Sequence, residues 1–79
     1  MIGITIEQLK ESVTKNLSDV IFDIDDLRCG IYPSTPENYD VGVGTRLIEN
    51  VKGFDRLLEV KINGKRLSEV ITKANIDIY

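Results

Sequence analysis

The chain has 79 residues, of which 42% are hydrophobic and 29% are charged, and its formal net charge is −3 at pH 7. These values predict a single folded domain over residues 1–79 and exclude an intrinsically disordered chain. The sequence has no histidine and one cysteine, Cys29, which excludes a disulfide within the chain and a zinc site built from histidine and cysteine ligands.

The first predicted element is a helix over residues 6–16. Residues 5–8 have the S/T-x-x-E/Q pattern of a capping box, in which Thr5 caps the helix and Gln8 reaches back to it. Three apolar residues follow at helical spacing, namely Ile6, Leu9 and Val13. Because this helix has one apolar stripe, we expect it to pack against a sheet.

Two short strands are predicted after the helix. Residues 20–24 are mainly β-branched and aromatic, which is typical of a strand, although a helical turn over residues 23–27 is the alternative. Residues 25 and 26 are both aspartate and form the predicted turn. Residues 27–32 then form the second predicted strand.

Residues 33–44 are predicted to form an irregular loop. Pro33 and Pro36 disfavour regular structure, and Gly42 and Gly44 prolong the segment with little stiffness. Loops of about 12 residues in a compact domain are often functional. We therefore expect partner contact in this segment.

The Asn63-Gly64 pair is the strongest structural signal in the second half of the chain. Alternating apolar and polar residues flank it, which predicts a two-residue hairpin with a type I′ turn. The predicted elements are a strand at 46–51, a turn at 52–55, hairpin strands at 56–62 and 65–71, and a closing strand at 74–79. In this register Leu58 would face Glu69, which favours a β-bulge near Ser68, with a helical turn beginning at Ser68 as the alternative.

Together these elements predict an α+β fold, with one N-terminal helix packed on a mainly antiparallel sheet of four or five strands and a C-terminal hairpin. The predicted core consists of the apolar residues that share one face of each element. Its members are Ile6, Leu9, Val13, Ile21, Leu47, Leu58, Val60, Ile62, Leu67, Ile76 and Ile78.

Charge is unevenly distributed along the chain. Residues 19–40 hold six acidic residues and one basic residue, whereas residues 46–73 hold seven basic and four acidic residues. The first interpretation of this dipole is an ordinary solvated surface, and head-to-tail self-association or a charged partner is the alternative. The candidate partner-binding residues are Asp23, Asp25, Asp26, Tyr32, Glu37, Tyr39 and Asp40.

No catalytic, cofactor or metal motif is complete. Gly42 and Gly44 resemble the start of a dinucleotide-binding fingerprint, but Leu47 stands where the third glycine is required. Residues 23–25 resemble the start of a calcium loop whose glycine and glutamate are absent. We expect no enzyme, no cofactor and no bound metal, with a divalent metal at the aspartates of residues 23–26 as the enzymatic alternative.

The last 25 residues carry a family resemblance. The segments LLEVKINGK at residues 57–65, VI at 70–71 and ANIDI at 74–78 resemble small β-rich proteins encoded by phages and prophages of Gram-positive bacteria. Such proteins are mostly accessory or virion-associated factors. The resemblance implies a phage-related origin and assigns no functional residue.

These observations predict a non-enzymatic protein-interaction module, a phage-encoded adaptor or inhibitor, with an oligomeric structural subunit of a phage particle as the alternative. The sequence pI of about 4.8 argues against nucleic-acid binding. No apolar run approaches the roughly 18 residues of a membrane span, and no signal peptide is recognised. We therefore expect a protein partner or a second copy of the chain, no membrane, and a location in the host cytoplasm or the virion.

Overall fold

The computed structural model describes residues 2–79, which form three helices and seven strands. The predicted α+β class is confirmed: the N-terminal helix packs on an antiparallel sheet. The elements in chain order are α1 (Ile6–Thr14), β1 (Val20–Ile24), β2 (Leu27–Thr35), β3 (Asn38–Val43), β4 (Arg46–Lys52), α2 (Phe54–Leu58), β5 (Lys61–Ile62), β6 (Lys65–Arg66), α3 (Leu67–Val70) and β7 (Asn75–Ile78).

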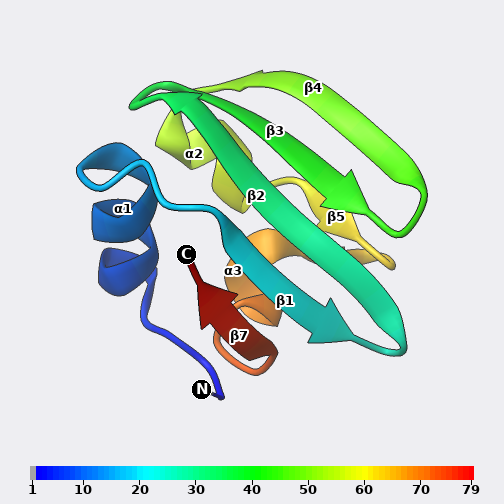
Figure 1. Ribbon diagram of the computed structural model, residues 1–79. Coiled ribbons are helices and arrows are strands. Elements are labelled where there is room, and N and C mark those ends of the chain that lie inside the picture. The colour runs from blue at the N-terminus through cyan, green and yellow to red at the C-terminus, as the bar shows by residue number, and fades with distance from the viewer. Residues whose placement is uncertain (1) are drawn as a thin grey trace.

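The main sheet has five strands in the order β4-β3-β2-β1-β7, and every neighbouring pair is antiparallel. Strands β1 to β4 form a meander, whereas β7 returns to pair with β1 at the opposite edge. The three helices and the β5–β6 hairpin lie on one side of this sheet (Figure 1). The hydrophobic core fills the space between these two layers.

Helix α1 begins at the predicted capping box. The Thr5 Oγ1 accepts from the Gln8 backbone N–H at 3.0 Å, and the Gln8 Oε1 accepts from the Thr5 backbone N–H at 2.9 Å. Leu9 and Val13 are buried against the sheet, as their spacing predicts. The helix ends at Thr14, two residues earlier than predicted, because Lys15 already caps its C-terminus.

Replacing Thr5 by alanine is expected to lower the free energy of unfolding by about 1 kcal/mol, because the first turn of α1 loses a side-chain acceptor. The measurement is urea denaturation followed by circular dichroism. Thr45→Ala is the matched control, since Thr45 is an exposed residue of the turn between β3 and β4. Equal midpoints for the two variants would show that the cap does not stabilise the native state.

The strand at residues 20–24 and the following turn are confirmed, whereas the predicted loop over residues 33–44 is wrong. Strand β2 continues to Thr35, and β3 occupies most of the remainder. Pro33 is tolerated because β2 pairs with β1 only as far as Ile31, and a register shift follows Pro33 in the pairing with β3. The segment is a paired hairpin whose exposed turn is confined to Pro36 and Glu37.

The Asn63-Gly64 turn is confirmed, with φ values of 53° and 83° that suit a type I′ turn. Its strands have only two residues each, so the predicted long strands at 56–62 and 65–71 are wrong. Helices α2 and α3 flank the hairpin instead. The expected β-bulge near Ser68 is also wrong, and the alternative of a helical turn in this region is right.

Helix α3 forms because it buries more apolar surface than a strand would. Leu67, Val70 and Ile71 are all buried, and their spacing of three and four residues places them on one helical face. A strand would point Val70 away from Leu67, toward solvent. Tertiary burial therefore decides the conformation of this segment.

The core differs from the predicted one mainly in the sheet. Leu9, Val13, Ile62, Leu67 and Ile76 are buried as predicted, and Ile6, Leu58 and Val60 pack at its margin. The predictions for Ile21, Leu47 and Ile78 are wrong, because these residues are half-buried or exposed. Seven buried residues of the sheet lie outside the predicted core, namely Val20, Phe22, Cys29, Ile31, Tyr39, Val41 and Val43.

Candidate protein-interaction face

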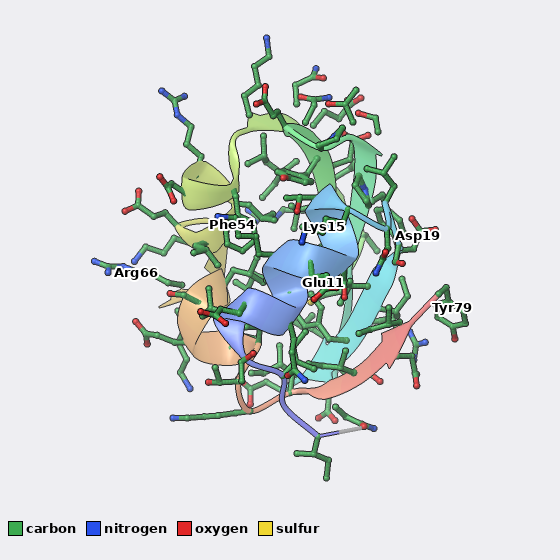
Figure 2. All side chains as sticks on the ribbon, turned by 90° about the vertical axis from the view of Figure 1, so that its left-hand side faces the viewer. Glu11, Lys15, Asp19, Phe54, Arg66 and Tyr79 are labelled. Carbon is green, nitrogen blue, oxygen red and sulfur yellow. The ribbon has the colours of Figure 1, made fainter. Side chains whose placement is uncertain are left out.

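The face of the sheet opposite the helices is not covered by any element of residues 2–79. Strand alternation sends Val20 and Phe22 toward the helices, so the residues between and after them point the other way. In Figure 2 the helices lie on one side of the sheet, while Asp19 and Tyr79 lie on the other, away from Phe54 and Arg66. We call this surface the open face and define it by Ile21, Asp23, Arg28, Gly30, Tyr32, Asp40, Gly42, Leu47 and Asp77.

Two glycines on neighbouring strands make room for an aromatic ring at the centre of the open face. Gly30 of β2 lies directly opposite Gly42 of β3. A Cβ atom added at Gly30 would lie 2.9 Å from the Tyr32 Cε2 and closer still to the hydroxyl end of the ring, while one added at Gly42 would lie 3.5 Å from Cε2. The Tyr32 ring therefore rests on Gly30 and borders Gly42.

Apolar side chains flank the glycine pair. Ile21 on β1 lies opposite Gly30, and Leu47 on β4 lies opposite Gly42. Leu47 is 57% exposed and Tyr32 is 40% exposed, whereas the core residues of the same strands are buried. The row from Ile21 to Leu47 thus forms an apolar band across four strands.

Charged side chains border this band. Asp23 and Arg28 face each other on β1 and β2 and form an ion pair with an N–O distance of 3.1 Å. Asp77 lies opposite Ile21 on β7, and Asp40 lies opposite Tyr32 on β3. The open face therefore carries three carboxylates and one guanidinium group, and this guanidinium group already forms an ion pair with Asp23.

Asp40 also shapes the neighbouring edge strand. Its Oδ1 accepts from the Asn50 backbone N–H at 3.0 Å, where β4 shifts register and Asn50 adopts a φ of 57°. The irregularity interrupts the free edge of β4, a feature that disfavours edge-to-edge pairing. The uncovered face offers a partner a more regular surface than this edge does.

The structure brings together only some of the predicted site residues. Asp23, Tyr32 and Asp40 share the open face. Asp25 and Asp26 occupy the turn between β1 and β2, where the Asp25 carboxylate accepts from the Asn63 side chain at 3.1 Å. The other two predicted residues lie at or near the turn between β2 and β3.

Glu37 is exposed at the tip of the β2–β3 turn, but Tyr39 is fully buried and cannot contact a partner. The Tyr39 hydroxyl donates to the Pro36 carbonyl. Burial raises the pKa of Tyr39, and the negative charge of Glu37 adds to the rise. Tyr39 is therefore a neutral core residue that holds the turn.

Ile21, Leu47 and the glycine pair were not among the predicted site residues. The available signal was the alternation in Val41-Gly42-Val43, where two valines share one face and the glycine lies on the other. The sequence places Gly42 and Gly44 in a predicted loop, where alternation defines no face. Strand pairing was needed to place Leu47 beside Gly42.

The structure also places the candidate metal-ligating and nucleophilic side chains. Among residues 2–79, no group of three or more histidine, cysteine, aspartate or glutamate side chains is placed to hold a metal ion. Burial raises the pKa of the Cys29 thiol, the charge of Asp23 adds to the rise, and a hydrogen bond with the Gly44 backbone opposes it. The thiol stays protonated at neutral pH, which makes it a poor nucleophile.

A shallow groove of about 760 Å³ lies on the helix side, between α1, the β2–β3 turn and the start of α2. Its lining includes Phe54, Lys10 and Lys52, together with Glu37. The Lys10 ammonium lies 5.9 Å from the centre of the Phe54 ring, a cation–π distance. The groove therefore combines an aromatic ring with side chains of both charge signs.

A scan against protein-family models, a search of curated proteins and a search of solved structures each found no match. The function is therefore inferred from the geometry of the chain. The resemblance of its last 25 residues to phage proteins stays a prediction. No helix within residues 2–79 is long and apolar enough to cross a membrane.

Proposed function

We propose that the protein is a non-enzymatic interaction module that binds another protein through the open face of its sheet. The observation that carries this proposal is the asymmetry of the sheet. One face is covered by three helices, while the other exposes Tyr32 and Leu47 beside the half-buried Ile21. Exposed aromatic side chains in well-packed surroundings often supply a large share of the binding energy at protein interfaces.

The size of the molecule limits the interface. Its accessible surface is 4846 Å², so the roughly 800 Å² per partner of a standard stable complex would occupy about a sixth of it, roughly one whole face. Binding through such a face must depend on a few residues at its centre. Tyr32 occupies that position, because its ring lies between Ile21 and Leu47 over the glycine pair.

The resemblance of residues 57–78 to phage-encoded proteins supports the more specific proposal of an accessory adaptor or inhibitor that acts on a host protein. An adaptor or inhibitor needs an accessible surface and no catalytic group. The open face provides the surface. The protonated Cys29 thiol and the absence of histidine fit a protein that does not catalyse a reaction.

One observation favours an oligomeric structural subunit as the second candidate. Residues 53–74, which form α2, the hairpin and α3 on the helix side, hold five basic and three acidic residues. The open face holds an excess of carboxylates. Head-to-tail stacking of copies would bring these opposite surfaces together and would extend into a filament or close into a ring.

Replacement of Tyr32 by alanine is expected to weaken binding of the cellular partner at least tenfold. The test immobilises the full chain, identifies proteins captured from the cells that naturally produce it, and remeasures affinity with each purified candidate. Glu69→Ala on the helix side is the control and should leave the affinity unchanged. Equal affinities of Tyr32→Ala and the original chain would overturn the proposed site.

Sedimentation at increasing protein concentration separates the two candidate functions. A monomer at all concentrations is expected for the adaptor or inhibitor. Self-association that Tyr32→Ala abolishes would support the oligomeric subunit instead.

A further inference from the structure

We propose that the open face recognises an arginine-rich protein segment, with an arginine side chain stacked on the Tyr32 ring. This inference rests on the proposed function, because it names the chemistry of the partner that the open face binds. The ring is the first element of the site. Its inner side rests on Gly30, and its outer side is accessible because no element of residues 2–79 covers the open face.

Three carboxylates that form no ion pair within residues 2–79 lie on the same side of the sheet as the ring. Asp40 lies opposite Tyr32 on β3, and Asp77 lies opposite Ile21 on β7. Asp19 precedes Val20, and Tyr32 follows Ile31, the residue that pairs with Val20. Asp19 and Tyr32 are therefore neighbours across the two strands, and Figure 2 shows Asp19 on the open side of the sheet. The ion pair of Asp23 with Arg28 is the only one within 4.0 Å among residues 2–79.

This arrangement selects the class of partner. The carboxylates repel the phosphates of RNA or DNA, although exposed aromatic rings on open sheets can stack with bases. They attract cations, and a tyrosine ring binds a cation on its face. Arginine satisfies both requirements, because the planar guanidinium group stacks on an aromatic ring and donates hydrogen bonds to carboxylates.

The two glycines provide a matched pair of variants. Gly30→Ala adds a methyl group that would lie 2.9 Å from the Tyr32 Cε2, so the ring must leave its position. Gly42→Ala adds the same group at 3.5 Å from the same atom, an ordinary van der Waals contact. Gly30 and Gly42 both adopt strand conformations with negative φ, so alanine does not strain the backbone at either position.

The test measures binding of the full chain to fluorescent nona-arginine and nona-lysine peptides by polarisation, at low and at physiological salt. We expect nona-arginine to bind about two- to fivefold more tightly than nona-lysine, since lysine lacks the planar group that stacks on the ring. Gly30→Ala is expected to abolish this preference, and Gly42→Ala to retain it. Thermal unfolding confirms that both variants are folded.

Further variants distinguish the contribution of the Tyr32 ring to binding from that of the carboxylates. Tyr32→Phe is expected to keep the preference for arginine, and Tyr32→Leu to lose it. Asp40→Asn and Asp77→Asn are expected to weaken both peptides and to reduce the salt dependence of binding. An equal affinity for the two peptides in the original chain would overturn the proposal, as would tighter binding of single-stranded RNA.

Competition with the cellular partner distinguishes this inference from the proposed function. If nona-arginine displaces a partner that binds through Tyr32, both are supported. If the partner binds through Tyr32 and nona-arginine does not displace it, the inference of an arginine-rich partner is wrong. The proposal that the open face binds a protein is then still supported. If a second copy of the chain occupies the face and nona-arginine does not dissociate the oligomer, the inference is also overturned.

Discussion

Replacing Phe22 by alanine is expected to lower the free energy of unfolding by about 3–5 kcal/mol. The Phe22 ring is fully buried on β1, between the central strand and the edge strand, and its strand neighbours are Cys29 on β2 and Ile76 on β7. Its removal deletes apolar contacts and leaves a cavity that the paired strands cannot readily close. A chain of 79 residues has a total stability of roughly 4–12 kcal/mol, so this single change removes much of it.

The neighbouring residue provides the control for this prediction. Ile21 is half-buried on the open face, so Ile21→Ala should cost less than about 1.5 kcal/mol. Urea denaturation of both variants, followed by circular dichroism, measures the difference. A larger loss for Ile21→Ala than for Phe22→Ala would contradict the assignment of the two faces of β1.

Replacing Leu57 by alanine is expected to lower the free energy of unfolding by about 2–5 kcal/mol. Leu57 is fully buried in α2, and its position follows from the helical conformation of residues 54–58. In the strand predicted from the sequence, Leu58 would face the core and Leu57 would face solvent. The same substitution at the two adjacent positions therefore distinguishes the helix from the strand.

Leu58 is only partly buried, and Leu58→Ala should cost about half as much as Leu57→Ala or less. The midpoint and slope of urea denaturation are measured for both variants, because an unchanged slope shows that the unfolding reaction is the same. Equal losses at the two positions, or a larger loss at Leu58, would contradict the α2 helix.

The sequence predicted elements that depend on local chemistry. The capping box at Thr5 and Gln8 forms within a single turn, and so does the Asn63-Gly64 turn, whose positive φ values these residues tolerate. The strand at 20–24 was predictable because β-branched and aromatic residues fill it. In each case the determining contacts lie within a few residues of one another.

The errors occur where a segment had two acceptable conformations. Residues 54–58 and 67–70 contain short apolar runs that fit a strand or a helical turn, and their length is too small for periodicity to decide. Residues 33–43 contain prolines and glycines that are typical of loops. They form a hairpin because pairing of β3 with β2 and with β4 satisfies their backbone and buries Tyr39 and Val41.

Some features of the candidate site could likewise be predicted from the sequence, and others required the folded structure. Asp23, Tyr32 and Asp40 could be named from the sequence because acidic and aromatic residues concentrate in residues 19–40. The placement of the Tyr32 ring over Gly30 could not be predicted, because it requires the side-chain conformation in the folded sheet. Tyr39 was misassigned for the same reason, since one position along β3 separates an open-face residue from a core residue.

The sequence by itself therefore determined the α+β class, the start of α1 and the Asn63-Gly64 turn, because short-range hydrogen bonds and backbone preferences control these features. The tertiary structure decided the rest: the helical state of α2 and α3, the order of the five strands, and the uncovered face that carries Tyr32 and Leu47. These depend on which apolar groups are buried together, and that choice is made between segments far apart in the chain.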